Sequence, residues 1–203
     1  QAGLRLGSTY LIYQCHKPPT RHPMKTNTLL ISLLAGLGLA LTSNAREKSG
    51  VAEGILVSKD KNSISVVVDG SEEPMRFTPH WRGGNPKDGG GLDKKMVEEI
   101  KELIVSNRVR VKWEYEERHR VVDVETIIPK SKRGTVRGTV VSKGKNHVDV
   151  KPSDGGPVER YLPHWRGKGL DQDVLRQIAP LEVGQKVSVR WEYDERKRVL
   201  SIR

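Results

Sequence analysis

The sequence predicts a mainly β protein of two tandem units, each a five-stranded barrel with one helix between its third and fourth strands. Three observations predict this fold class. A long stretch of the chain occurs twice, short β-rich runs alternate with polar turns, and one helical period interrupts those runs in each copy. We expect the units at residues 54–128 and 138–203, joined by a basic linker at 129–137.

The duplication is visible in several matching stretches. "GILVSKDKNSISV" from Gly54 matches "GTVVSKGKNHVDV" from Gly138, and "TPHWRG" from Thr78 matches "LPHWRG" from Leu162, each at a spacing of 84 positions. "VRVKWEYEERHRVV" matches "VSVRWEYDERKRVL" at a spacing of 78, because the first copy has six extra residues in a glycine-rich stretch. An insertion of that composition indicates a surface loop.

The hydrophobic period changes in the same order in each copy. Three β-rich runs come first, represented by "GILVSKD", "SISVVVD" and "MRFTPHW". A helical period follows, with Asp93 and Asp171 at the N-cap positions, where a carboxylate accepts from the free amides of the first turn. Pro180 should end the second helix early. The apolar faces of the two helices are Leu92, Met96, Val97, Ile100, Leu103 and Ile104, and Leu170, Val174, Leu175, Ile178 and Leu181.

Strict alternation marks the fourth run. Val109, Val111, Trp113 and Tyr115 point one way, so we expect them, with Trp191 and Tyr193 of the second copy, to lie in the cores. A polar turn and a fifth run, "RVVDVETI" in the first copy, complete each unit.

The resulting order, β-β-β-α-β-β, resembles the OB-fold, a five-stranded Greek-key barrel. The resemblance is one of layout and covers both copies. The chain is also similar to small exported bacterial repeat proteins of unassigned function that carry the signatures "PHWRGG…GGLD" and "WEYEER", and this resemblance implies no activity. An SH3-like barrel is the alternative, but the helix within each unit fits it less well.

The beginning of the chain predicts export. Residues 24–45 combine Lys25, a short apolar run and small residues before Ala45, which is typical of a cleaved secretory signal. The run is shorter than the roughly 20 residues of a membrane span, so we expect no transmembrane segment after cleavage and a periplasmic or extracellular location. An uncleaved anchor is the alternative. Residues 1–23, which hold the only cysteine, Cys15, are interpreted as an extension that is not native.

The charge balance favours a negatively charged partner. The chain has 36 Lys and Arg against 25 Asp and Glu, and the part after residue 45 keeps a formal charge of +7. A basic protein of this kind attracts anionic polymers, here nucleic acid or acidic polysaccharide. The alternative interpretation is that the charged hairpin tips are simply exposed to solvent, and that neighbouring acidic residues offset their positive charge. The candidate ligand-binding residues at the hairpin tips are Lys59, Lys61, Arg118 and Arg120, with their copies Lys143, Lys145, Arg196 and Arg198.

The repeated Pro-His-Trp-Arg-Gly has two interpretations. In the first, Trp81 and Trp165 are stacking platforms for bases or sugars, while Arg82 and Arg166 hold an anion. In the second, each tryptophan closes one end of its barrel where the chain turns toward the helix. The large area that an indole buries favours the second interpretation.

We expect neither an enzyme nor a cofactor. Each copy has one matched histidine, His80 or His164, and zinc needs three or four ligands, so we expect no metal site. An OB-fold nuclease is the enzymatic alternative and would need clustered carboxylates. These are Asp69, Glu72 and Glu73 in the first copy, but only Asp154 in the second. A structural or protein-interaction role, with a partner protein in the cell envelope, is the non-enzymatic alternative.

Overall fold

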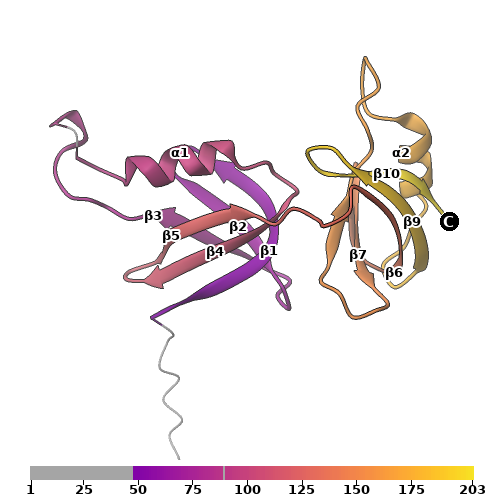
Figure 1. Ribbon diagram of the computed structural model, residues 1–203, viewed down its shortest axis with the longest axis horizontal. Coiled ribbons are helices and arrows are strands. Elements are labelled where there is room, and N and C mark those ends of the chain that lie inside the picture. The colour runs from indigo at the N-terminus through magenta and orange to yellow at the C-terminus, as the bar shows by residue number, and fades with distance from the viewer. Residues whose placement is uncertain (1–47, 89) are drawn as a thin grey trace, which may run out of the picture. The chain divides into compact units, whose positions relative to one another are not determined.

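The computed structural model describes residues 48–88 and 90–203 and is shown in Figure 1. The predicted signal segment, the upstream extension and Cys15 lie outside the described residues. The described chain is mainly β, as predicted, with ten strands and two α-helices.

Residues 49–126 form a closed five-stranded barrel, called here the N-terminal barrel. Its strands follow the order β1-β2-β3-β5-β4, and β1 pairs with β4 to close it. All pairings are antiparallel except that of β3 with β5, which is parallel. The elements are β1 (Ser49–Asp60), β2 (Ser63–Val68), β3 (Pro74–Pro79), the 3-10 turn η1 (Pro86–Asp88), α1 (Lys94–Glu102), β4 (Arg108–Tyr115) and β5 (His119–Thr126).

Residues 133–202 form a second five-stranded sheet, called here the C-terminal sheet. Its strand order is β10-β9-β6-β7-β8. This sheet does not close into a barrel, so the prediction of two closed barrels is confirmed for the first unit alone. In the N-terminal barrel, β3 and β5 pair with each other. At the matching place in the C-terminal sheet there is one isolated bridge, between Leu162 and Arg198. The elements are β6 (Arg133–Gly144), β7 (His147–Pro152), β8 (Glu159–Tyr161), α2 (Gln172–Ile178), β9 (Lys186–Tyr193) and β10 (Lys197–Ile202).

Each unit has its own hydrophobic core, built from the alternating positions of its strands and one face of its helix. Trp113 and Trp191 are each 9% exposed and belong to these cores, which confirms their predicted placement. Tyr115 and Tyr193 pack against the edges of the same cores. Both helices begin as predicted, since Asp93 caps α1 and Asp171 caps α2, and α2 stops before the proline at position 180. Leu103, Ile104 and Leu181 were predicted on the helical faces but lie beyond the helix ends.

The first strand of each unit starts earlier than predicted. β1 begins at Ser49 rather than at residue 54, and β6 begins at Arg133, inside the predicted linker. Gly50 lies opposite Trp113, and Gly134 lies opposite Trp191. A Cβ at either glycine would approach the indole to 2.9 Å or 3.0 Å, so each ring packs directly on bare backbone. Each of these segments carries a glycine at its second position, and glycine is depleted in strands, so the sequence placed both boundaries too late.

Candidate functional site

The Pro-His-Trp-Arg-Gly segment ties the end of the third strand to the start of the helix in each unit. In the N-terminal barrel, the Asp93 amide donates to the His80 carbonyl at 2.8 Å, and Trp81 forms a bridge with Leu92. In the C-terminal sheet, Asp171 donates to His164 at 2.8 Å in the same way, and Trp165 bridges Leu170. The segment therefore occurs twice because the same joint between strand and helix is built twice.

The arginine of each segment is held by the aspartate that caps the helix. Arg82 Nε donates to Asp93 Oδ2 at 3.0 Å, and Arg166 Nε donates to Asp171 Oδ2 at 3.1 Å. The hydrogen bond from Arg82, together with one from the Met96 amide, lowers the pKa of Asp93 below its usual value. Burial acts to raise the pKa of Asp171, but the bonds from Arg166 and from two backbone amides outweigh it, so this pKa is also lowered. Neither arginine is a free cation.

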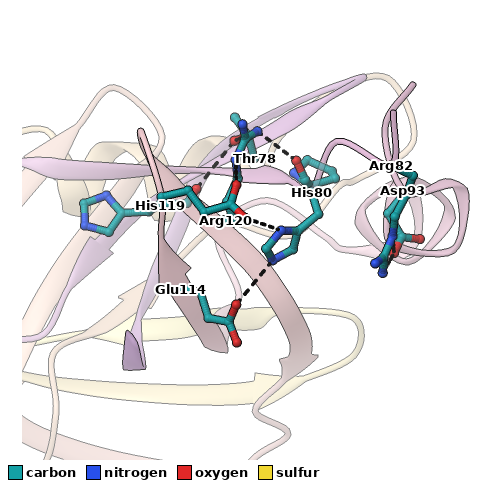
Figure 2. A network of polar contacts seen from close by, with 9 residues as sticks. Thr78, His80, Arg82, Asp93, Glu114, His119 and Arg120 are labelled. Atoms are coloured by element: carbon teal, nitrogen blue, oxygen red, sulfur yellow. Dashed lines mark hydrogen bonds and ion pairs between the residues drawn. The ribbon is translucent and has the colours of Figure 1, made fainter. Parts of the chain in front are cut away.

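The histidine of each segment contacts glutamates of the following strands. Figure 2 shows His80, whose Nδ1 lies 3.4 Å from Glu116 Oε1 and whose Nε2 lies 3.9 Å from Glu114 Oε2. In the C-terminal sheet, His164 Nε2 lies 2.9 Å from Glu192 Oε1. A shallow pocket of about 250 Å³ opens here, lined by His80, Arg82, Asp93, Glu114, Val121 and Val122. Its charged side chains already have partners of opposite sign, and this leaves little charge to attract an ion.

The two tryptophans of these segments are exposed. Trp81 is 53% exposed and Trp165 is 64% exposed, so the interpretation that they close the barrel ends is wrong. Trp165 Nε1 donates to the carbonyl of Gly167 at 2.8 Å, which fixes the indole at the surface. The local backbone, rather than burial of the ring, determines where these side chains lie.

Four of the eight predicted hairpin-tip cations are bound to their own unit. Lys59 Nζ donates to the Lys101 and Leu103 carbonyls at 2.5 Å each, and Lys143 Nζ donates to the Ala179 carbonyl at 2.7 Å. These two lysines therefore cap the C-terminal ends of α1 and α2, where a cation is favoured by the helix dipole.

The other two bound cations are the second arginines of the last hairpins. Arg120 is labelled in Figure 2, and its Nη1 donates to the Pro79 carbonyl at 3.1 Å. Arg198 Nη1 donates to the Pro163 carbonyl at 3.0 Å and is buried. These arginines hold the third strand against the fifth. Of the remaining candidates, Lys61, Arg118 and Lys145 are exposed, and Arg196 is partly buried.

Asp69, one of the carboxylates of the nuclease alternative, is also engaged. Arg108 Nη1 donates to Asp69 Oδ1 at 2.9 Å, and Arg108 Nη2 donates to Asp69 Oδ2 at 2.6 Å. Both oxygens of Asp69 therefore face a guanidinium. Within residues 48–88 and 90–203, no three His, Cys, Asp or Glu side chains form a group that could hold a metal ion.

Positive charge is distributed unequally between the two units, which the sequence analysis did not consider. Residues 48–128 carry 14 Lys and Arg against 15 Asp and Glu, whereas residues 129–203 carry 17 against nine. The formal net charges are therefore −1 and +8, with histidines neutral. The excess positive charge of the described chain therefore lies in the second unit.

The outer face of the N-terminal barrel is neutralised by ion pairs across its strands. Arg110 on β4 donates to Glu53 on β1 at 2.7 Å and to Glu125 on β5 at 2.6 Å. Lys112 donates to Asp123 at 2.8 Å. The hydrogen bonds from Arg110, to Glu53 first and then to Glu125, raise the pKa of this guanidinium. Cross-strand pairing of this kind leaves the face without excess charge.

On the same outer face of the C-terminal sheet, several cations have no acidic partner. Strand register places Arg137 opposite Ser188 and Thr139 opposite both Lys186 and Lys151. Residues directly opposite each other on paired strands share a face. The exposed cations on this surface, called here the basic face, are Arg137, Lys151, Lys186, Arg190 and Arg203. None of the five has an Asp or Glu oxygen within 4.0 Å among the described residues.

The difference between the two faces comes from three matched positions. At the spacings of 84 and 78, Glu53 matches Arg137, Asp123 matches Ser201, and Glu125 matches Arg203. Every acid that neutralises the first face is thus replaced in the second by arginine or serine. A comparison of outward-facing positions between the two copies would have found this signal in the sequence alone.

Comparison with known proteins adds no family. No protein-family model matches the chain, and no curated protein matches its sequence significantly. Among the helices of the described residues, none is both long and apolar enough to span a membrane.

Proposed function

We propose that this chain is a non-enzymatic binding protein that acts outside the cytoplasm, in the periplasm or beyond, on a negatively charged polymer. The observation that carries the proposal is the basic face, where five exposed cations lie on one sheet without acidic partners. Unpaired exposed cations repel one another, which gives no benefit to folding. Retaining them together on one surface favours a role in attracting an anion.

We propose, as the finer description of the fold, that both units are OB-like modules. The order β1-β2-β3-β5-β4, with α1 between β3 and β4, supports this description for the N-terminal barrel. The C-terminal sheet has the same order of elements, and OB-folds are in general only partly closed. The matched segments support a duplication as the origin of the two units.

The spread of the cations favours a polymer over a small anion. Neighbouring strands lie about 4.8 Å apart, and alternate residues of one strand lie about 7 Å apart, so these cations span several such intervals. An extended ligand with repeated charges can contact several of them at once and release several counterions. A single small anion would contact one or two.

Salt dependence tests the proposed function. We expect the protein to be retained on an immobilised polyanion at low salt and released as salt rises, with a linear fall of log affinity against log salt. The measurement is a series of binding isotherms between about 50 and 200 mM salt, a range over which about five charge contacts lose roughly 10²–10³ in affinity. Absence of binding at low salt to a sulfated glycan, a polyuronate and DNA alike would contradict the proposal.

Binding of a partner through Trp81 and Trp165 is the second candidate function. Their exposure at matched positions favours it, because large exposed aromatic side chains are enriched where proteins meet partners. The double variant Trp81→Ala with Trp165→Ala separates the candidates. Polyanion affinity should change less than threefold if the basic face is the contact surface. A loss above tenfold would move the site to the tryptophans.

A further inference from the structure

We propose that the basic face of the C-terminal sheet is the surface that contacts the polymer, and that this polymer is an acidic polysaccharide. The inference rests on the proposed function and names its surface and its ligand class. It replaces the hairpin tips as the contact surface, because half of their cations cap helices or hold strands together.

Two of the three acids nearest to the basic face, Asp149 and Glu192, pair with arginines outside it, and the third, Asp154, has no cation of the face within 4.0 Å among the described residues. Asp149 on β7 takes both of its hydrogen bonds, at 2.7 Å each, from Arg160. Glu192 at the end of β9 contacts Arg133 at 3.3 Å in addition to its histidine. Asp154 shares a hollow of about 420 Å³ with Arg137, and its carboxylate accepts from the Gly156 amide at 3.0 Å. The positive charge of the face therefore remains available to a ligand.

Hydroxyl groups accompany the cations. Thr135, Thr139 and Ser188 lie on the same side of β6 and β9 as the arginines and lysines, by strand register. A linear acidic polysaccharide carries carboxylate or sulfate groups between sugar hydroxyls. Arginine binds such planar or multi-oxygen anions through two parallel hydrogen bonds, and the threonines and serine can exchange hydrogen bonds with sugar hydroxyls.

The composition of the face argues against nucleic acid. Proteins that bind single-stranded nucleic acid combine positive charge with aromatic rings on which bases stack, and the outward positions of β6, β7 and β9 hold no phenylalanine, tyrosine or tryptophan in the described chain. Proteins that recognise the sequence of duplex DNA insert a helix or a two-stranded β-ribbon into a groove. The basic face is the surface of a sheet, with no helix to insert into a groove. Such a surface suits an extended ligand that is recognised through its charges and hydroxyl groups.

The test compares two triple variants that each remove three positive charges. The face variant is Arg137→Gln with Lys186→Gln and Arg190→Gln, and the matched control is Lys61→Gln with Arg118→Gln and Lys145→Gln. Probes are a fluorescent heparin dodecasaccharide, an oligogalacturonate, and single- and double-stranded DNA of equal charge, measured by anisotropy in the full chain. We expect the wild type to bind a glycan at least tenfold tighter than either DNA. The face variant should lose at least tenfold in affinity for the glycan, and the control variant should lose less than threefold.

Each other outcome has a distinct meaning. Loss of affinity in the control variant but not in the face variant overturns the choice of surface and leaves the proposed function standing. Binding of DNA as tightly as of the glycans, with loss in the face variant, overturns the polysaccharide and keeps the surface. Absence of binding to every probe at low salt overturns the proposed function itself. Circular dichroism checks that both variants are folded, and a salt slope smaller by about two to three in the face variant shows that lost contacts cause the loss.

Discussion

At the scale of single residues, each unit packs one glycine directly against the indole of its core tryptophan. Gly50 and Gly134 leave room for the Trp113 and Trp191 indoles, and the strands could not approach so closely with any larger residue. Because a core tolerates little added volume, we expect Gly50→Ala and Gly134→Ala each to destabilise the protein by about 1–2 kcal/mol. Urea unfolding measures this loss.

Gly169 provides the matched control for these two substitutions. A Cβ at Gly169 would have no atom within 4 Å. Replacing this glycine with alanine should leave stability unchanged or raise it by about 0.5 kcal/mol, since alanine restricts the unfolded chain. Equal losses at all three positions would mean that contact with the indole is not the cause.

At the scale of elements, the seven-residue α2 depends strongly on its cap. Asp171 accepts from the Asp173 and Val174 amides and pairs with Arg166, and we expect Asp171→Ala to cost about 1 kcal/mol at pH 7. The pKa of Asp171 is lowered in the folded protein, so the ionised form stabilises the fold above the unfolded pKa near 4. This contribution is lost as pH falls through the lower folded pKa.

The Asp171→Asn variant separates capping from charge. Asparagine also caps helices well, so this variant should retain much of the stability at pH 7 but lose the pH dependence that Asp171 contributes. Thermal unfolding from pH 7 to pH 2.5 measures both effects. If the difference in stability between wild type and Asp171→Ala stayed constant over that pH range, the ionised carboxylate would not be the source of the pH dependence.

The elements themselves were predictable because their signals are local. Alternation at positions 109–115 and the helical period from position 92 depend on neighbours within a few residues. The partners of Lys59 lie 42 and 44 residues away at the end of α1, so nothing near the hairpin indicates that this lysine caps a helix. The exposure of Trp81 likewise follows from the bridge with Leu92 rather than from its own hydrophobicity.

At the scale of the whole molecule, charge separates two units that otherwise share their order of elements. Arg137 and Arg203 stand where the N-terminal barrel has Glu53 and Glu125. We expect the double variant Arg137→Glu with Arg203→Glu to stabilise the protein by about 0.5–1 kcal/mol at low salt, because both positions face Ser188 and lie diagonal to Lys186 and Arg190, so that attraction replaces repulsion between like charges. The measurement is urea unfolding at about 20 mM and 500 mM salt, with screening reducing the gain.

The same double variant links stability to binding. It should bind acidic glycans at least tenfold more weakly while it unfolds at higher urea concentration. Such an exchange is expected where a surface is kept for function at the expense of stability. A variant that gained no stability at low salt would show that the basic face does not strain the fold.

The early start of β1 limits how far the N-terminus can be trimmed by proteases. The Lys48 carbonyl accepts from the Tyr115 amide at 2.7 Å, and Gly50 covers one side of the Trp113 indole. Cleavage after Ala45 leaves both contacts intact. A peptidase that removed the chain as far as Gly54 would take away six of the seven paired positions between β1 and β4 and let water reach the core. An N-terminus at or before residue 48 therefore keeps the closure of the N-terminal barrel intact.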